Sequence, residues 1–595
     1  MTLQNTLANY IQESLFKIFG FKVELEGKTI QKTNKEFEGD FTFVVFPYVK
    51  SLRKPPEKIA NEIGEYLVTK HTCFIKSFNV IKGFLNISLQ KQVWFDVMKG
   101  EGRREKGEGR REKGGGYMVE YSSPNTNKPL HLGHIRNNLL GNAIANILEA
   151  NGNQVIRVNL VNDRGIHICK SMLAWKKFGN NETPESSGIK GDHLVGKYYV
   201  LFDQKLKEEV ATLIIQGLSD EEALKKSLLL HQAQEMLQKW EENDTETRNI
   251  WEQMNSWVYK GFEETYQRLG IFFDKTYYES NTYLLGRQIV EEGLQIGAFY
   301  KKTDGSVWVD LSAQGLDEKL LLRSNGTSVY ITQDIGTAQQ RYDEYHPKKM
   351  IYVVGNEQNY HFEVLKLILS KKLHKNFGDN IEHLSYGMVE LPSGKMKSRE
   401  GTVVDADDLM EAMFQEAKAT SEALGKFDFE EKEAVALYEM LGLGALKYFI
   451  LKVDPKKNML FNPEESIDFN GNTAPFIQYT HARIKSLLRK AKETNIEFEK
   501  TLPEVFTCKM EIELIKLLYD YNEVLVNAAE LLNPALIANY AFELAKEFNR
   551  FYQDIPIFKV DNVQIRDFRL QIAHHCANRI KNAMNLLGIE VPERM

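Results

Sequence analysis

The stretch "YMVEYSSPNTNKPLHLGHIRNNLLGNAIANILEANG", residues 117–152, decides the fold. It begins as a short strand, continues through a loop rich in Pro and Asn, and then has the apolar spacing of a helix that ends at Gly152. The same strand-then-loop pattern returns at residues 154–161, 349–355 and 383–391, with helical patterns between them. Strands that alternate with helices predict an α/β domain with a parallel sheet.

The rest of the chain divides around this sheet domain. Residues 1–98 mix helix and strand patterns and predict a small α+β domain. The heptad Gly-Glu-Gly-Arg-Arg-Glu-Lys occurs twice at 100–113, and its lack of apolar residues predicts a flexible linker over 99–116. Its glutamates offset its arginines, which disfavours an RNA-binding arm. The sheet domain is expected over 117–465, with a charged helical insertion at about 170–290, and an all-helical domain over 466–595.

Composition is that of an ordinary globular protein. The 595 residues carry a net charge of −6, so no global basic field indicates a nucleic-acid partner. The four cysteines form no Cys-x-x-Cys pair, which argues against a disulfide framework or a zinc knuckle and fits the cytoplasm. The N-terminus has the pattern of an amphipathic helix without a basic leader. No apolar run approaches the roughly 18 residues of a membrane span, so no membrane association is expected.

The loop-to-helix junction at 131–134 is the first candidate for chemistry. His131 and His134 flank Gly133 at the expected start of a helix. In a nucleotide-binding sheet this place suits ATP, because helix-start N–H groups face the phosphates and a glycine lets the adenine approach the backbone. Two imidazoles there can donate hydrogen bonds to charge that develops on the α-phosphate. The alternatives are a zinc pair, for which no third ligand is obvious nearby, or two histidines that cap the helix.

A second candidate is "LPSGKMKSREGTVVDADDL", residues 391–409. Its lysines suit phosphates, and the aspartates that follow suit the first turn of a helix. An ordinary solvated surface turn is the alternative.

Taken together, these stretches resemble one enzyme family. "VEYSSPNTNKPLHLGH" and "GKMKSREGTVV" are similar to the HIGH and KMSKS signatures of class I aminoacyl-tRNA synthetases, and their flanks resemble the arginyl-tRNA synthetases. The likeness covers nearly the whole chain apart from the linker. It extends to "GDHLVGKYYVLF", "NGNTAPFIQYTHARI", "EFNRFYQDIPI" and "LLGIEVPERM".

The resemblance implies a Rossmann-type catalytic domain that joins arginine to ATP, with Mg²⁺, and releases pyrophosphate. The arginyl group then moves to the 2′-hydroxyl of the terminal adenosine of tRNA(Arg). The α+β domain is expected to be the family's additional tRNA-binding domain, and the helical domain its anticodon-binding domain. The family expectation is a monomer that shows little pyrophosphate exchange without tRNA.

The nucleotide site follows from the same resemblance. His131 and His134 are expected to hold the phosphates, with Gly133 at the nucleotide. Against Lys-Met-Ser-Lys-Ser, the first lysine is Lys395, followed by Met396 and Lys397, and the usual second lysine is replaced by Ser398. Many arginyl enzymes instead carry a lysine just before the HIGH motif, which here is Lys128. The missing charge is therefore expected on Lys128, opposite Lys395.

The side chains of the arginine site can be predicted in part from the chemistry of the guanidinium group. A guanidinium is planar and always charged, so its pocket should offer a carboxylate and neutral acceptors. Tyr330 and Asp334 are four residues apart and share one face if their segment is helical. The resemblance places both at the guanidinium with Gln358, and places Glu120 and Asn125 at the ammonium and carboxylate end. The alternative for Asp334 is a surface acid or a helix cap. Lysine and ornithine would leave the acceptors unpaired, so no editing site is expected.

One stretch departs from the family pattern. "NDRGIHI" keeps Asp163 and Gly165 but has Arg164 and His167 in the variable places, and no role is assigned to these two.

The tRNA-facing residues are predicted from type and position. Basic residues of "QYTHARIKSLLRKAK" suit phosphates, whereas aromatic and amide side chains suit unstacked bases. Core packing is the alternative for each of them. The candidates are Arg483, Lys485, Arg489 and Lys490 for phosphates, Gln478, Tyr479, Asn549 and Tyr552 for bases, and Phe41 and Phe43 for stacking at the tRNA elbow.

Three other readings stay open from the residues. A nucleotidyltransferase would use the same nucleotide site but would not need the helical domain. A synthetase for cysteine or lysine is nearer, although a cysteine enzyme would want zinc ligands. A non-catalytic tRNA-binding paralogue is disfavoured by the intact His131, His134, Tyr330, Asp334 and Gln358.

Overall fold

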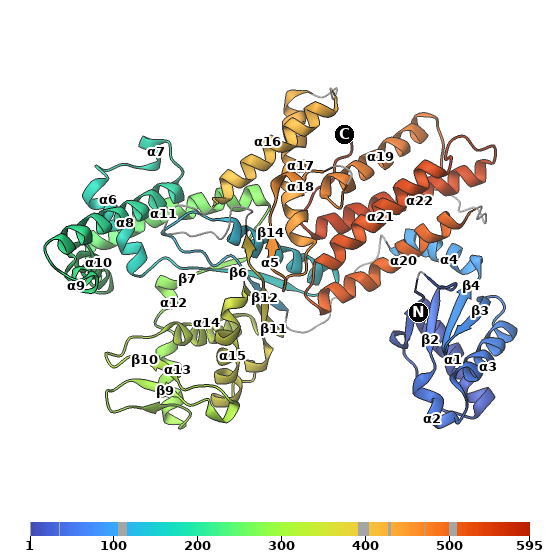
Figure 1. Cartoon of the computed structure of the whole chain (residues 1–595), viewed down its shortest axis with the longest axis horizontal. Helices are drawn as coiled ribbons and strands as arrows, with labels where there is room; N and C mark the ends of the chain where they lie inside the picture. Colours follow the sequence, from blue (N-terminus) through green and yellow to red (C-terminus); the bar gives the residue numbers. More distant parts are fainter. Residues whose placement is uncertain are drawn as a thin grey trace. The chain divides into compact units, whose positions relative to one another are not determined.

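The computed structural model describes residues 2–34, 36–104, 116–390, 404–425, 430–468, 471–498 and 508–595. The chain forms two compact units, and each is described by itself (Figure 1). The first consists of residues 1–108, 487–520 and 547–576, and the second of residues 109–486, 521–546 and 577–595.

The second unit is built on a five-stranded parallel sheet, which confirms the predicted fold class. The strands are β5 (Tyr117–Glu120), β6 (Val155–Val161), β7 (Lys275–Tyr278), β11 (Lys349–Gly355) and β12 (Ile381–Tyr386). Their order is β12-β11-β5-β6-β7, so the first strand in the chain lies in the middle. In such doubly wound sheets ligands bind at the carboxyl ends of the strands, where the strand order reverses. Here that point lies between β5 and β11.

Helix α5 (Leu132–Ala150) covers the sheet directly after β5. It packs against β5, β6 and β11 and is buried around most of its surface, as expected of a helix with few charged residues. On the sheet, Met118, Val158 and Met350 belong to a core cluster that also holds Ile335 and Ile381. The position of α5 is therefore set by its packing against three strands of the sheet.

The predicted insertion is helical, but the sheet resumes within it. Helices α6 (Ile166–Phe178), α8 (Gly191–Ile215), α10 (Leu228–Glu241) and α11 (Thr245–Leu269) come first. β7 then returns to the edge of the sheet inside the range expected to be insertion. After it follow α12 (Glu279–Thr282), α13 (Gly286–Gln295), a small antiparallel sheet of β8 (Tyr300–Lys301), β9 (Val307–Val309) and β10 (Lys319–Leu322), and α14 (Tyr330–Tyr345).

The first unit contains an α+β fold, as the sequence predicts. Its antiparallel sheet has the order β1-β2-β4-β3, formed by β1 (Ile30–Lys32), β2 (Phe41–Val44), β3 (Ile75–Ile81) and β4 (Phe84–Leu89). Helices α1 (Leu3–Phe19) and α3 (Pro56–Lys70) accompany it. Helix α4 (Lys91–Arg104) includes the first residues of the expected linker, so the linker does not begin at 99. Residues 105–115 lie outside the described residues.

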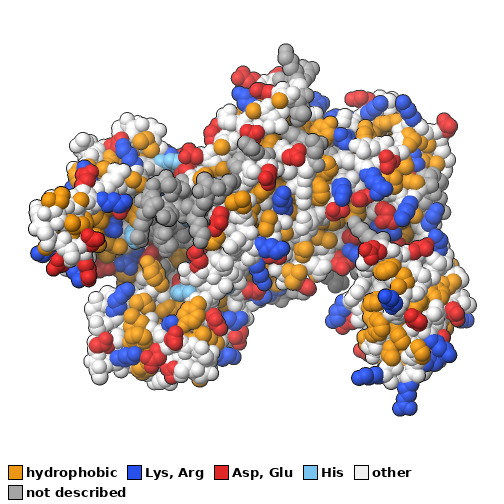
Figure 2. All heavy atoms as spheres, in the orientation of Figure 1, with side chains coloured by type: hydrophobic (Ala, Val, Ile, Leu, Met, Phe, Trp, Pro, Cys, Tyr) orange, Lys and Arg blue, Asp and Glu red, His pale blue; other side chains and the backbone are white. Residues whose placement is uncertain are grey.

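The described chain after residue 465 is largely helical, as predicted, and a long helix at 431–451 already precedes it. The helices are α17 (Glu431–Leu451), α19 (Ala474–Glu493), α20 (Lys509–Glu530), α21 (Ala535–Asp554) and α22 (Val563–Leu586). Within the described ranges, α17 alone is long and apolar enough for a membrane span, and 72% of that apolar window is buried in the fold, as in a core helix. Figure 2 shows acidic and basic side chains interspersed on the face in view, in agreement with the small net charge.

Candidate active site

The loop after β5 has a strained backbone that buried amides hold in place. Ser122 and Ser123 have positive φ angles of 77° and 46°, which residues with side chains rarely adopt. Asn137 Oδ1 accepts from the Ser122 N–H at 2.5 Å, and Asn159 Oδ1 accepts from the Ser123 N–H at 3.0 Å. Strain of this kind persists only where the surroundings enforce it, and it concentrates at functional sites.

His131 and His134 cap the first turn of α5 through one nitrogen each. His131 Nδ1 accepts from the Gly133 N–H at 3.1 Å, and His134 Nδ1 accepts from the His131 N–H at 3.2 Å. A ring nitrogen that accepts carries no proton, so each neutral ring holds its proton on Nε2. The capping alternative is therefore confirmed. It is also compatible with catalysis, because capping uses Nδ1 and leaves Nε2–H as the donor of each ring.

Burial and Lys128 keep these two rings neutral. Burial, with a smaller effect of Lys128, lowers the pKa of His131 to about 4. The pKa of His134 also lies well below its ordinary value because of burial, His131 and Lys128. Burial lowers the pKa of Lys128 itself. The structure thus places a lysine beside two neutral N–H donors, a combination that suits phosphate oxygens.

The structure gives a reason for a glycine at position 133 that the sequence did not predict. A Cβ at this position would lie 2.9 Å from His131 Cε1, so only glycine lets the ring fold back over the helix start. The close approach of adenine to Gly133 stays a prediction.

The segment before α16 (Ala406–Leu424) runs antiparallel beside the start of α5. The Leu132 N–H donates to Val404 O at 3.1 Å, and the Ala406 N–H donates to Leu130 O at 2.9 Å. Asp405 caps α16 by accepting from two N–H groups of its first turn, which confirms the predicted aspartate-rich helix start. Lys395, Met396, Lys397 and Ser398 lie outside the described residues.

Glu120, predicted for the ammonium end of arginine, is paired with a buried arginine. Arg341 of α14 is 1% exposed and forms an ion pair with Glu120 through Nη1. Burial lowers the pKa of Arg341, but Glu120 and the hydroxyls of Tyr352 and Tyr277 outweigh it and raise the pKa overall. Ser123 Oγ donates to Glu120 Oε1 at 3.2 Å. Glu120 is therefore held in place by two partners, Arg341 and Ser123.

Tyr330 and Asp334 lie in the first turns of helix α14, which confirms that their segment is helical. Asp334 Oδ2 accepts from His361 Nε2 at 2.6 Å, so it is not a helix cap. Tyr330 is 77% exposed, and Asn125 and Gln358 are exposed as well. Burial raises the pKa of the Tyr352 hydroxyl to about 12, and the charges of Glu120 and Asp334 both contribute to this rise. The carboxylates predicted for the two ends of arginine therefore lie in one neighbourhood.

Glu279 is a candidate that the sequence analysis missed. It follows β7 directly, as the first residue of α12. Burial raises the pKa of Glu279 to about 7, with Asp163 and Asp334 raising it further and Arg164 opposing them. This half-buried carboxyl group near Asp334 lacks enough positive charge around it, which is a condition that a guanidinium would correct. The signal available in the sequence was the four-residue strand "KTYY", hidden between helices.

Arg164 and Asp163 have structural roles. Arg164 lies 3.9 Å from the centre of the Tyr283 ring and forms an ion pair with Glu241 at 2.7 Å. Asp163 accepts from the Ser280 N–H and hydroxyl at 2.8 and 2.7 Å. The departure from the family pattern at Arg164 is thus a packing feature.

The expected stacking residues of the α+β domain are wrong. Phe41 and Phe43 are 2% and 1% exposed, and they stack on Trp94 and Tyr48 within the first unit. Residues two apart on a strand share a face, and here that face is the core. Neither ring has a surface left for a base.

The candidates in the helical region divide by exposure. Gln478 is fully buried, and its amide donates to the carbonyls of Met440 and Glu590, so a role in reading bases is wrong for it. Asn549 is buried as well. Tyr479 is 42% exposed, with the Arg483 guanidinium 4.7 Å from its ring centre, and Tyr552 is similarly exposed.

The basic candidates include residues that already make contacts. Lys485 forms an ion pair with Glu593 at 3.0 Å, and Lys490 lies 5.1 Å from the centre of the Phe558 ring. Arg489 is half-buried.

Three family models match the chain. Residues 103–462 match "tRNA synthetases class I (R), catalytic domain", 477–595 match "DALR anticodon binding domain", and 5–89 match "Arginyl tRNA synthetase N terminal domain". Proteins described as arginine–tRNA ligase from Bacteroides thetaiotaomicron and Parabacteroides distasonis are 56% and 54% identical, over the whole of both chains.

Solved structures agree with the fold. The arginyl-tRNA synthetase of Thermus thermophilus is 24% identical, covers 100% of both chains and has a TM-score of 0.78. That of Plasmodium falciparum is 21% identical, with the same coverage and TM-score. With the family models and the full-length relatives, the conclusion is direct: the chain belongs to the class I arginyl-tRNA synthetases, the ATP-dependent arginine–tRNA ligases of translation.

Proposed function

We propose that the strand ends of β5 and β11 carry both steps of the arginine–tRNA ligase reaction. Arginine attacks the α-phosphate of ATP, which gives arginyl-adenylate and pyrophosphate. The arginyl group then passes to the 2′-hydroxyl of the terminal adenosine of tRNA(Arg), and AMP is released. The observation that carries this proposal is the pair of neutral Nε2–H donors on His131 and His134, with Lys128 beside them.

These donors act where negative charge grows. As the arginine carboxylate adds to the α-phosphate, His131 and His134 donate from Nε2 to its oxygens, and neither ring has to lose a proton to do so. Lys128 adds a positive charge on this side, and Lys395 is proposed on the other. Mg²⁺ enters with ATP as part of the substrate, because imidazole and ammonium groups suit the phosphates rather than a hard cation.

The pocket for arginine is proposed to bind the two ends of the substrate separately. Glu120 accepts from the α-ammonium group, with Asn125 at the carboxylate. Asp334 and Glu279 accept from the guanidinium, with Tyr330 and Gln358 beside them. Arginine thereby supplies the positive charge that the surroundings of Glu279 lack.

We further propose that the helical domain binds the anticodon region, with Tyr479, Arg483 and Tyr552 at its surface, and that the α+β domain also contacts tRNA. The protein is proposed to work as a cytoplasmic monomer.

A charging assay tests the proposal. The purified protein is incubated with ATP, Mg²⁺ and each amino acid, with and without tRNA, and acid-precipitable aminoacyl-tRNA is followed. Charging of arginine alone is expected, with little pyrophosphate exchange in the absence of tRNA. Charging of another amino acid would favour another class I synthetase, and no charging at all would favour a non-catalytic tRNA-binding paralogue.

A further inference from the structure

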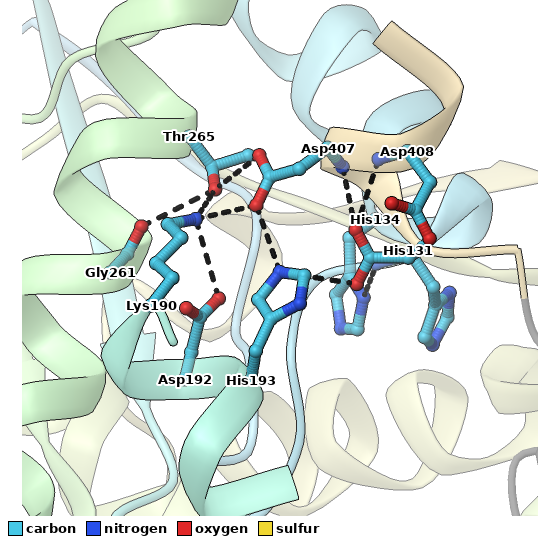
Figure 3. Close-up of polar contacts among 10 residues, drawn as sticks. His131, His134, Lys190, Asp192, His193, Gly261, Thr265, Asp407 and Asp408 are labelled. Carbon is cyan, nitrogen blue, oxygen red and sulfur yellow. Dashed lines mark hydrogen bonds and ion pairs between the residues drawn. The ribbon is translucent and has the colours of Figure 1, made fainter. Parts of the chain in front are cut away.

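A polar cluster joins the insertion helices to the start of α16. Asp407 of α16 accepts from three groups: Lys190 Nζ at 2.6 Å, Thr265 Oγ1 of α11 at 3.0 Å, and His193 Nε2 of α8 at 3.0 Å (Figure 3). Asp192 is fully buried beside them, 3.5 Å from Lys190 Nζ. The ammonium group of Lys190 lies near both Asp407 and Asp192, so the chain itself supplies the cation that this cluster needs.

His193 has a second acidic neighbour. Its Nε2 lies 3.5 Å from Asp405 Oδ2 as well as 3.0 Å from Asp407. Nε2 carries only one hydrogen, and the shorter distance assigns that hydrogen to Asp407. The attraction to Asp405 is therefore electrostatic, and it is at full strength only while the ring is protonated.

The charges around His193 favour the protonated ring. The charged groups that face it are Asp192 and Lys190 at the start of α8, and Asp405 and Asp407 at the start of α16. The hydrogen bond to Asp407 raises the pKa of His193, and the charges of Asp405 and Asp192 add to this against the opposing effect of burial. His193 thus titrates above its ordinary range.

Asp405 connects this cluster to the catalytic histidines. Its backbone forms an antiparallel bridge with His131. The residues on either side complete the bridge, because Leu132 donates to Val404 and Ala406 donates to Leu130. One residue is thus paired through its backbone with His131 and through its carboxylate with His193.

We propose that protonated His193 is a positioning residue for arginine activation: by holding Asp405 and Asp407 it fixes the segment that braces His131. The proposal rests on the proposed role of His131 at the ATP phosphates. It predicts that deprotonation of His193 loosens the brace and lowers the turnover number, while the binding of arginine, which uses α14 and β5, is unaffected.

The test compares His193→Gln with the wild type in tRNA charging at saturating substrates from pH 6 to 9. Glutamine can donate to Asp407 but cannot carry a charge. The expected results are a kcat about 10- to 100-fold lower, as for a small misplacement of a reacting group, an unchanged KM for arginine, and loss of the alkaline decline in kcat. Asp405→Asn keeps the acceptor that caps α16 and removes the charge. It should reproduce the flattened profile even if the histidine variant folds poorly.

His231→Gln is the matched control, since the His231 ring contacts the Lys225 carbonyl on the exposed face of α10. It should leave kcat and its pH profile unchanged. If His193→Gln retains the alkaline decline, or changes only the KM for arginine, the proposal is wrong. His131→Ala distinguishes a failure of the proposed role of His131 from a failure of the proposed role of His193. If it remains active, the role of His131 fails, and if it is inactive while His193→Gln behaves as the wild type, only the present inference fails.

Discussion

Arg341 and Glu120 form a buried ion pair that joins helix α14 to the end of strand β5. A charge taken out of water is tolerated when it is paired, and removing one partner leaves the other uncompensated. The pair therefore holds together the two elements from which the arginine pocket is proposed to be built.

Arg341→Met should destabilise the protein by about 3–5 kcal/mol, because Glu120 then lies buried without its cation. The KM for arginine should rise as well. Urea unfolding and charging kinetics measure the two effects. Combining the change with Glu120→Gln should cost less than the sum of the two single changes. Additive costs would show that the two side chains are not coupled.

Asp334→Asn should raise the KM for arginine about 10- to 100-fold, the worth of a hydrogen bond between charged groups. Asp343→Asn is a matched control, since Asp343 lies on the exposed side of the same helix and accepts from Gln339. Steady-state charging with saturating ATP and tRNA is the measurement. A near-normal KM for arginine would remove Asp334 from the pocket.

The affinity for arginine should depend on pH through Glu279, whose pKa burial raises to about 7. Below pH 7 its carboxyl group is protonated and must lose the proton before it can pair with a guanidinium. The KM for arginine should therefore fall as pH rises from 6 to 8, and this dependence should be weaker in Glu279→Gln. An identical slope in that variant would assign the titration to another group.

Lys128→Ala should lower kcat about 100- to 1000-fold, as the loss of one preorganised group at a developing charge does. Lys395→Ala should have a similar effect and Lys397→Ala a small one. Lys197→Ala is the control, because Lys197 is exposed and paired with Glu182. If Lys128→Ala is neutral and Lys397→Ala abolishes turnover, the proposed division between the two sides of the ATP site is wrong.

Tyr479→Ala should raise the KM for tRNA, because stacking on a base is worth about 1–3 kcal/mol. Tyr479→Phe, which keeps the ring, should remain close to the wild type. Gln478→Ala should instead lower the thermal midpoint, because the Gln478 amide donates to two backbone carbonyls in the core. Equal effects of Tyr479→Ala and Tyr479→Phe on tRNA would argue against stacking.

The sequence predicted the parts of the site that depend on local pattern. His131 and His134 lie at a strand-end loop that becomes a helix, and the spacing of Tyr330 and Asp334 is helical. Both are short-range features that periodicity reports well. The burial of Phe41 and Phe43 was also accessible, since residues two apart on an apolar strand face the same way.

The parts that failed depend on long-range contacts. Arg341 sits among polar residues of a helix whose pattern suggests a solvated face, and only its partner on β5 explains why it is buried. Glu279 follows a four-residue edge strand enclosed by helices, which a window long enough to detect a helix averages away.

Helix α14 has one more consequence. Asp334 lies in it, and Arg341, which fixes Glu120, follows about two turns later, at a rise of about 1.5 Å per residue. One end of the proposed pocket thus lies on α14, and the other end is paired to the same helix through Arg341. In the proposed pocket, the separation of the two ends would therefore follow from the geometry of α14 and of the Arg341–Glu120 pair.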